Sequence, residues 1–500
     1  MSVLNEMLSG IGRVRPNKVK IGVVGTMRKV FQEEYGKVRF REVVEAAKKD
    51  PRVEIITLEP AGVPDGIIYA GELAQTRAAI NLLLNKRIEG LVIAPCNYGD
   101  EEAAATIAGE VYKARGIPIY TYVWPDAPIN VDGTRVLDNE CGIFPMRMHM
   151  ASRMKKQPGY FPFGSVDDID IRNAWDLFVR ACSGLHSIRN VKLLQIGADQ
   201  PTFYAIEGDP FQMREKFNLR VETKDISTLI KFVNDCIGPS EEPPEWFQPL
   251  RDEIFETFDF SATRNAMPML PNKLTLILGW VIEQMKATQS NSLTIRCWDE
   301  LFKILGTMVC CLNGLLFSKG IMAPCETDKP GVLASALMYG LGIGDEDGYD
   351  FFADLTRWDN GRPLWWHCGP FPPTGLRCRG EKAKICAGWI FPGITCGGLI
   401  GGQWGQLCDA VTFCQIRPNP EGKFTLVGMN GKICDGPSTI GTHFYTSTKD
   451  KKATWKFIME NPFDHHNSGR KGNLLPALEK VAPWLGLDTE PAFLDNIGGD

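Results

Sequence analysis

The stretch that decides the fold is VKIGVVGT, residues 19–26, a short apolar run that contains two glycines. Such a run is typical of a buried parallel strand, because both faces of that strand are covered by helices. A helical stretch, FREVVEAAKKD, and a second apolar run, VEIITLEP, come next in the chain. The alternation predicts an open parallel sheet with helices on both faces.

The same alternation continues to about residue 150. Helical stretches at residues 74–87 and 101–116 flank the apolar run EGLVIAPCNYGD, and IPIYTYVW at residues 117–124 ends the series. Ligands of parallel sheets meet the loops at the carboxyl ends of the strands. Those loops hold Arg28 after the first strand and Trp124 after the last.

Two later changes in the sequence pattern predict further domains. After KKQPGYFPFGS, strands such as VKLLQIGA and SLTIRCW alternate with helices, the last of them at residues 301–320, which predicts a second α/β domain. From about residue 350, short runs such as PLWWHCG and KFTLVGMNG predict an antiparallel sheet or barrel. We therefore expect an α/β domain at residues 1–160, a second at 161–345, and a β-barrel-like domain at 346–500.

Composition excludes several classes of protein. The net charge of -5 over 500 residues leaves no dominant basic patch, so we expect no nucleic-acid partner. No apolar run reaches about 18 residues, and the first twenty lack the apolar core of a secretory signal, so we expect a cytoplasmic protein without a membrane partner. The 15 cysteines form no CxxC pair, which favours reduced thiols over a zinc ribbon.

Two carboxylates follow apolar runs in the C-terminal half of the chain. Glu326 follows the apolar residues 321–325 in APCETDKPG, and Asp354 follows two phenylalanines in FFADL. A carboxylate at a buried strand end is costly unless a metal or hydrogen bonds compensate it. For Glu326 a helix N-terminus, with Thr327 as the cap and Asp328 favoured by the dipole, is an alternative explanation.

Four of the six histidines fall in the last third of the chain. His367 lies in the apolar run PLWWHCG, where a lone histidine is usually a hydrogen-bonded core residue. His465 and His466 lie in DHH, which also suits an exposed loop. Two carboxylates with one or two histidines supply the oxygen and nitrogen ligands of a Mn²⁺- or Mg²⁺-type site.

Several motifs, in this order, resemble the fucose isomerase-like family. They are GLVIAPCNYGDEEA, DGTRVLDNECG, SLTIRCWDEL, GIMAPCETDKPGVLASALM, FFADLTRWDN, LWWHCG and the late DHH. Two segments depart from the family pattern. Thr327 to Pro330 replaces a small residue followed by an aromatic residue or glycine, and NSGRKGN after His466 replaces an apolar strand.

The resemblance implies a metal-dependent aldose–ketose isomerase that acts on an open-chain pentose or deoxyhexose through a cis-enediol. It implies Mn²⁺ as the cofactor, with Mg²⁺ or Co²⁺ as alternatives. Glu326 and Asp354 fall on the family's metal-binding and catalytic carboxylates. His367 falls on a metal ligand of the arabinose branch, and His466, or His465 in its place, on the late histidine ligand.

The resemblance also implies a homo-oligomer, a trimer or hexamer, whose neighbouring subunits complete the sugar site. Arg28, Trp124 and His465 are the expected sugar contacts on this basis. Trp404 is a further candidate, because an aromatic face packs well against the apolar face of a sugar. Two other functions fit the same residues: a metal-dependent lyase or epimerase on a related sugar derivative, and a non-catalytic sugar-binding protein.

Overall fold

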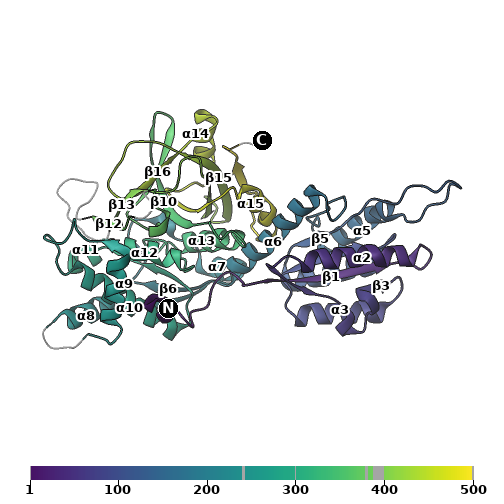
Figure 1. The fold of residues 1–500 in the computed structure, drawn as a ribbon, viewed down its shortest axis with the longest axis horizontal. Coiled ribbons are helices and arrows are strands. Elements are labelled where there is room, and N and C mark those ends of the chain that lie inside the picture. Colours follow the sequence, from purple (N-terminus) through teal and green to yellow (C-terminus); the bar gives the residue numbers. More distant parts are fainter. Residues whose placement is uncertain (1, 239–242, 299, 378–380, 387–398, 498–500) are drawn as a thin grey trace. The chain divides into compact units, whose positions relative to one another are not determined.

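The computed structural model describes residues 2–238, 243–298, 300–377, 381–386 and 399–497. The chain forms two compact units. One contains residues 16–186 and 476–484, and the other contains residues 1–15, 187–475 and 485–500 (Figure 1). The three expected domain boundaries stay a prediction.

The unit of residues 16–186 is built on a parallel sheet in the order β2-β1-β4-β5, with β3 paired to the end of β1. Its parallel pairing confirms the expected α/β architecture. The elements are β1 (Val19–Met27), α2 (Glu33–Lys48), β2 (Val53–Ile56), β3 (Ile67–Tyr69), α3 (Leu73–Asn85), β4 (Gly90–Pro95), α4 (Glu101–Arg115), β5 (Ile119–Thr121), α5 (Asn139–Met154) and α6 (Ile169–Arg189).

Local sequence explains the elements of this sheet. β1 is buried along its length except at Lys20, as a strand covered on both faces requires. α4 begins at Asp100, whose carboxylate accepts a hydrogen bond from the Ala103 N–H. It ends at Gly116, which adopts the left-handed conformation that glycine tolerates best.

The second unit contains a parallel sheet in the order β7-β6-β9. The apolar segment 321–325 runs parallel to β9, with bridges from Ser292 to Met322 and from Ile295 to Cys325. Glu326 therefore follows the carboxyl end of a strand-like segment, as the sequence predicts. The elements are α1 (Val3–Met7), β6 (Lys192–Ile196), α7 (Pro210–Phe217), β7 (Arg220–Lys224), α8 (Ile226–Ile237), α9 (Phe247–Thr257), β8 (Phe258–Asp259), α10 (Leu270–Thr288), β9 (Ser292–Ile295), α11 (Glu300–Leu305), α12 (Cys310–Ser318) and α13 (Lys329–Leu341).

The single helix expected at residues 301–320 is wrong. Two helices, α11 and α12, occupy this stretch, and Gly306 between them has a φ of +66°. A residue in this conformation ends an α-helix, because it turns the backbone out of the helical path.

Six antiparallel strands form a closed barrel in the same unit. The ring runs β15-β14-β17-β10-β11-β16, and pairing between β15 and β16 closes it. This confirms the expected C-terminal antiparallel barrel. The strands are β10 (Asp350–Asp359), β11 (Arg362–His367), β14 (Ala410–Pro418), β15 (Phe424–Cys434), β16 (Thr442–Thr446) and β17 (His466–Lys471); further elements of this unit are β12 (Ala383–Cys386), β13 (Leu399–Gln403), α14 (Lys451–Glu460) and β18 (Ala492–Leu494). From residue 476 on, α15 (Leu475–Val481) belongs to the other unit.

Successive side chains of β10 point alternately into the barrel core and toward the opposite face, which carries Asp354. Phe351 and Ala353 belong to the buried core cluster. Asp350, Phe352 and Asp354 therefore face the opposite side of the strand. On that side α13 packs across β10, β14 and β17 (Figure 1).

The polar segment NSGRKGN forms β17 although it lacks the expected apolar pattern. Gly469 lies against the Phe351 ring, where a Cβ would come within 2.2 Å. On the other face the Ser468 hydroxyl is 2.8 Å from that of Ser335 in α13, and Arg470 pairs with Asp350. Ser468 and Arg470 can occupy this buried strand because each has a polar partner there. Within the described residues, no helix is long and apolar enough to cross a membrane.

Candidate metal centre

Glu326 sits on a strained turn between the segment 321–325 and α13. Both Glu326 and Thr327 have a φ of +60°, a conformation that is rare for a β-branched residue such as threonine. The Thr327 hydroxyl donates to the Glu326 carbonyl at 2.6 Å and accepts from the Gln200 N–H at 3.0 Å. Strain held in place by such bonds is typical of functional sites.

The turn brings the Glu326 carboxylate to side chains from three barrel strands. His466 Nε2 lies 3.3 Å from Glu326 Oε2 and 3.7 Å from Asp354 Oδ1. His367 Nε2 lies 3.8 Å from the same Asp354 oxygen. The four residues that the sequence singled out therefore converge at one point.

The atoms that face this point have no hydrogen-bond partner among the described residues. They are Glu326 Oε2, Asp354 Oδ1, His367 Nε2 and His466 Nε2, and all are buried. Ligand atoms at about 2.1 Å from an octahedral cation lie about 3 Å apart, close to the separations from His466. Unsatisfied oxygen and nitrogen atoms at this spacing fit a divalent cation.

A buried network fixes the orientation of His466. Its Nδ1 lies 3.0 Å from Asp328 Oδ2, and Arg417 donates to both oxygens of Asp328 at 2.8 and 2.7 Å. Asp328 also caps α13 through the Gly331 N–H. With Nδ1–H donated to a carboxylate, His466 presents the lone pair of Nε2, as metal-bound histidines do.

His367 has a different hydrogen-bond arrangement. Its Nδ1 accepts the Cys368 N–H at 2.8 Å. In the neutral ring the proton therefore lies on Nε2, which faces Asp354. This arrangement suits His367 as a hydrogen-bond donor at the site. Its ring nitrogen also lies with ligand atoms of Asp354 and His466 around one point that could hold an ion, so its role as a metal ligand stays a prediction.

The charges of the site are not balanced by the protein alone. Burial opposes the charged form of His466, but Asp328 and Glu326 outweigh it and raise its pKa well above the usual value. Burial likewise opposes charge on His367, but Asp354 raises its pKa to about 10. An excess of negative charge that draws protons onto histidines also suits a bound cation, because metal and protons compete for such groups.

Two cysteine thiols, Cys325 and Cys297, lie close to the Glu326 side of the site. Cys325 can reach the same centre as Glu326 and His367, and its sulfur lies 3.3 Å from that of Cys297. The hydrogen bond to Cys325 and burial raise the pKa of the Cys297 thiol well above its usual value. These surroundings favour the neutral form of the Cys297 thiol.

The predicted sugar contacts have different surroundings. His465 can reach the same centre as Glu326 and His466. Trp404 is fully buried in the barrel core, where Phe351 and Phe444 pack against it, so its ring has no face for a sugar. This position supports packing rather than the predicted contact.

Arg28 and Trp124 belong to the unit of residues 16–186. The Arg28 N–H donates to the Asn97 side chain at 3.0 Å, and its guanidinium lies over the Tyr98 ring. Trp124 is buried, 3% exposed, beside Tyr122. Their roles as sugar contacts stay predictions.

Asp328 and Arg417 were not predicted as site residues. In the sequence Asp328 is explained by a favourable charge at the start of a helix. No local pattern distinguishes Arg417 within the apolar strand β14. Only the fold brings them together, at a sequence separation of 89 residues.

Comparison with known proteins finds similarity to sugar isomerases. Residues 22–189 match the family described as "Fucose/sulfoquinovose isomerase, N-terminal domain". A sulfoquinovose isomerase from Alkalicoccus urumqiensis is 21% identical over 318 residues, which cover 63% of this chain and 68% of that protein. One from Priestia aryabhattai is 20% identical over 345 residues, which cover 68% and 72%.

Proposed function

We propose, on the premise that this chain belongs to the fucose isomerase-like family, that it is a metal-dependent aldose–ketose isomerase. The observation that carries the proposal is the convergence of Glu326, Asp354 and His466, each with a buried atom that lacks a hydrogen-bond partner. The relatives are sulfoquinovose isomerases. Sulfoquinovose, a 6-deoxyhexose with a sulfonate on carbon 6, is therefore the first substrate to test.

We assign the cation to Glu326, Asp354 and His466. Mn²⁺ is the proposed ion, with Mg²⁺ or Co²⁺ as alternatives, because carboxylate and imidazole ligands suit these ions. When bound, such an ion polarises the carbonyl and the adjacent hydroxyl of an open-chain sugar. Asp328 acts as a positioning residue, because its bond to Nδ1 directs His466 Nε2 toward the carboxylates.

The two carboxylates then carry the proton transfers. One removes the proton from C2 of the aldose and returns it to C1, while the other passes the hydroxyl proton from O2 to O1. The intermediate between these steps is a cis-enediol, and the atoms balance because an aldose and its ketose are isomers. His367 donates its Nε2–H to a substrate oxygen in this scheme.

The first experiment removes metal with a chelator and restores Mn²⁺. Ketose formation from sulfoquinovose, L-fucose, D-arabinose and L-arabinose is then measured by NMR. We expect turnover of one of these sugars that depends on added metal. Metal binding without turnover of any of them, or cleavage of the carbon chain, would contradict the isomerase and favour a lyase or epimerase.

A further inference from the structure

One histidine beside the metal centre differs from the other two in its exposure. The side chain of His465 is 45% exposed, whereas those of His367 and His466 are each 1% exposed. A ring nitrogen of His465 nevertheless lies within 4.8 Å of ligand atoms of Glu326 and His466. A sugar that arrives from solvent can therefore contact His465 while its oxygens lie at the centre.

A carboxylate orients the His465 ring. His465 Nδ1 lies 2.7 Å from Asp464 Oδ1, and the His465 backbone N–H donates to the same oxygen at 2.7 Å. Asp464 is itself fixed, because its Oδ2 lies 3.3 Å from the Arg417 guanidinium and its N–H donates to the Gln415 side chain at 2.8 Å. With a carboxylate at Nδ1, that nitrogen carries the ring proton and Nε2 presents its lone pair.

The second ring nitrogen of His465 is available to a substrate. Nε2 has no hydrogen-bond partner among the residues that the structure describes, and the Phe203 ring packs edge-on against the imidazole with the ring centroids 6.2 Å apart. An imidazole held by a carboxylate at one nitrogen can take a proton at the other and return it, because the carboxylate stabilises the charged ring. Such a pair suits a step that moves one proton between two oxygens of a sugar.

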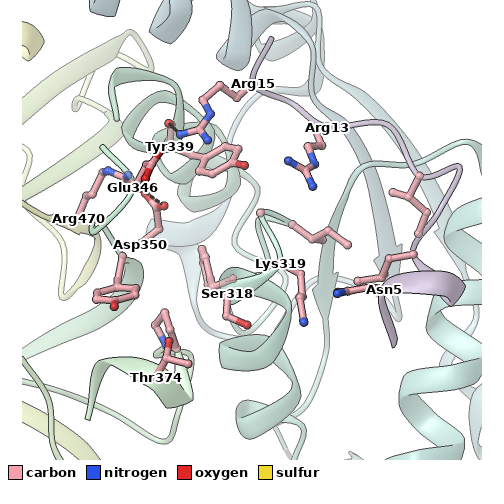
Figure 2. Close-up of a pocket in the computed structure, with 18 of the residues that line it drawn as sticks. Asn5, Arg13, Arg15, Ser318, Lys319, Tyr339, Glu346, Asp350, Thr374 and Arg470 are labelled. Carbon is pink, nitrogen blue, oxygen red and sulfur yellow. Dashed lines mark hydrogen bonds and ion pairs between the residues drawn. The ribbon is translucent and has the colours of Figure 1, made fainter. Parts of the chain in front are cut away.

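The carboxylate at the other end of the β10–β17 ladder is paired with an arginine instead. Asp350 and Arg470 form this pair, and their side chains are 4% and 2% exposed (Figure 2). The pocket beside them is lined by acidic and basic side chains alike, among them Glu346 and Arg13. An arginine keeps its proton at any physiological pH, so the buried pair cannot pass one to a ligand. The exposed histidine at the metal end is the better candidate for proton transfer.

We infer that the Asp464–His465 pair opens the sugar ring before isomerisation. The inference rests on the proposed function, because an aldose in water is cyclic for most of the time and the isomerase acts on the open chain. His465 Nε2 takes the proton of the anomeric hydroxyl, the bond from C1 to the ring oxygen breaks as the C1 carbonyl forms, and Nε2 returns the proton to the ring oxygen. Asp464 acts as a positioning residue.

Proton NMR on the full-length protein loaded with diamagnetic Mg²⁺ tests the inference. Sulfoquinovose, L-fucose, D-arabinose and L-arabinose are the probes, and magnetisation transfer between the two anomeric signals measures ring opening. The ketose signals report isomerisation in the same sample. We expect the protein to speed anomer exchange of at least one probe and His465→Gln to slow that exchange by about 100-fold.

Two controls accompany the variant. His149→Gln removes a histidine that lies 3.6 Å from Glu102 in the other unit, and it should leave anomer exchange unchanged. Mn²⁺ affinity of His465→Gln should stay within about threefold of wild type, because the proposed ligands remain. His465 is exposed, so its variant should fold, which circular dichroism checks.

Three results overturn the inference: no accelerated exchange for any probe, exchange unchanged in His465→Gln, or a loss of Mn²⁺ affinity in that variant of about 100-fold, which would make His465 a ligand. The ketose signals separate this inference from the isomerase. Exchange that depends on His465 without ketose supports ring opening and contradicts the isomerase. Ketose formation without accelerated exchange does the reverse.

Discussion

The two ends of the β10–β17 ladder carry similar residues on the same face but differ in how charge is balanced. At one end Asp350 faces Arg470, and the two charges cancel. At the other end Asp354 and Glu326 face His466, so two carboxylates meet one histidine and their charges do not cancel. An arginine keeps its charge at any physiological pH, whereas a histidine can give up its proton and bind a cation. The Asp350–Arg470 end therefore suits a structural ion pair, whereas the end with Glu326, Asp354 and His466 suits a bound cation.

The largest expected effect comes from removing a carboxylate at the metal end. Glu326→Gln and Asp354→Asn should each lower kcat/KM by about 10³-fold while the protein stays folded, because each loses a proton-transfer group. Ketose formation and circular dichroism are the measurements. Asp347→Asn, an exposed acid before β10, is the control. Wild-type turnover in either carboxylate variant rules out its assignment.

Breaking the other end should cost stability instead. Asp350→Ala leaves the buried Arg470 charge unpaired, which should lower the free energy of unfolding by about 3–5 kcal/mol. Urea unfolding measures this change. The double variant Asp350→Leu with Arg470→Met should recover much of the loss, because no buried charge remains. A loss below about 1 kcal/mol in the single variant would show that the pair is not structural.

The two histidines should separate in metal affinity. His466→Gln should weaken Mn²⁺ binding by about 100-fold or more, because the ligand is lost. His367→Gln should leave the affinity within about threefold and lower turnover, because its Nε2–H is a donor. Calorimetric titration with Mn²⁺ and kinetics on the same samples make the comparison. Equal losses of affinity would make His367 a ligand, as the family resemblance predicts.

The smallest expected effect is a difference between Asp350 and Asp328 in how each makes the stability of the metal-free protein depend on pH. Burial raises the pKa of Asp350, so as the pH falls the folded state takes up a proton before the unfolded state does. The wild-type protein should therefore gain stability relative to Asp350→Asn as the pH falls through that raised pKa. Burial of Asp328 is outweighed by Arg417, and its pKa lies well below the usual value. The stability that ionised Asp328 contributes is fully present above the unfolded pKa of about 3.9, and it is lost as the pH falls below that value.

Urea unfolding between pH 7 and pH 3 measures both trends against Asp350→Asn and Asp328→Asn. Each should be on the order of 1–2 kcal/mol. Trends of the same sign would contradict the difference between these two buried acids.

Sequence patterns predicted the fold where hydrophobicity alone decides it. The run at residues 19–26 became the central strand β1, and the alternating runs after residue 350 became the barrel. The pattern failed at residues 301–320, where Gly306 divides one expected helix into two. It also failed in β17, where Ser468 and Arg470 pair with residues far away in the sequence. Long-range pairing leaves no periodic trace in the sequence.

The candidate site was predictable in part for the same reason. Glu326, Asp354 and His367 lie at or near the ends of apolar runs, so their positions could be inferred locally, and the resemblance added His466. Arg417 could not be found, because its partner Asp328 is 89 residues away. The burial of Trp404 in the barrel depends on which strands close the ring.

The closed ring has a consequence for how the centre responds to heat. Asp354, His367 and His466 lie on β10, β11 and β17, which are consecutive strands of a barrel without free edges. Their amides should exchange hydrogen slowly and lose protection in one cooperative step. Glu326 lies on a turn outside the ring, so its local opening can release the ion while the barrel stays intact. For the proposed cation, opening of this turn, rather than of the barrel, is then expected to set how long the ion stays bound.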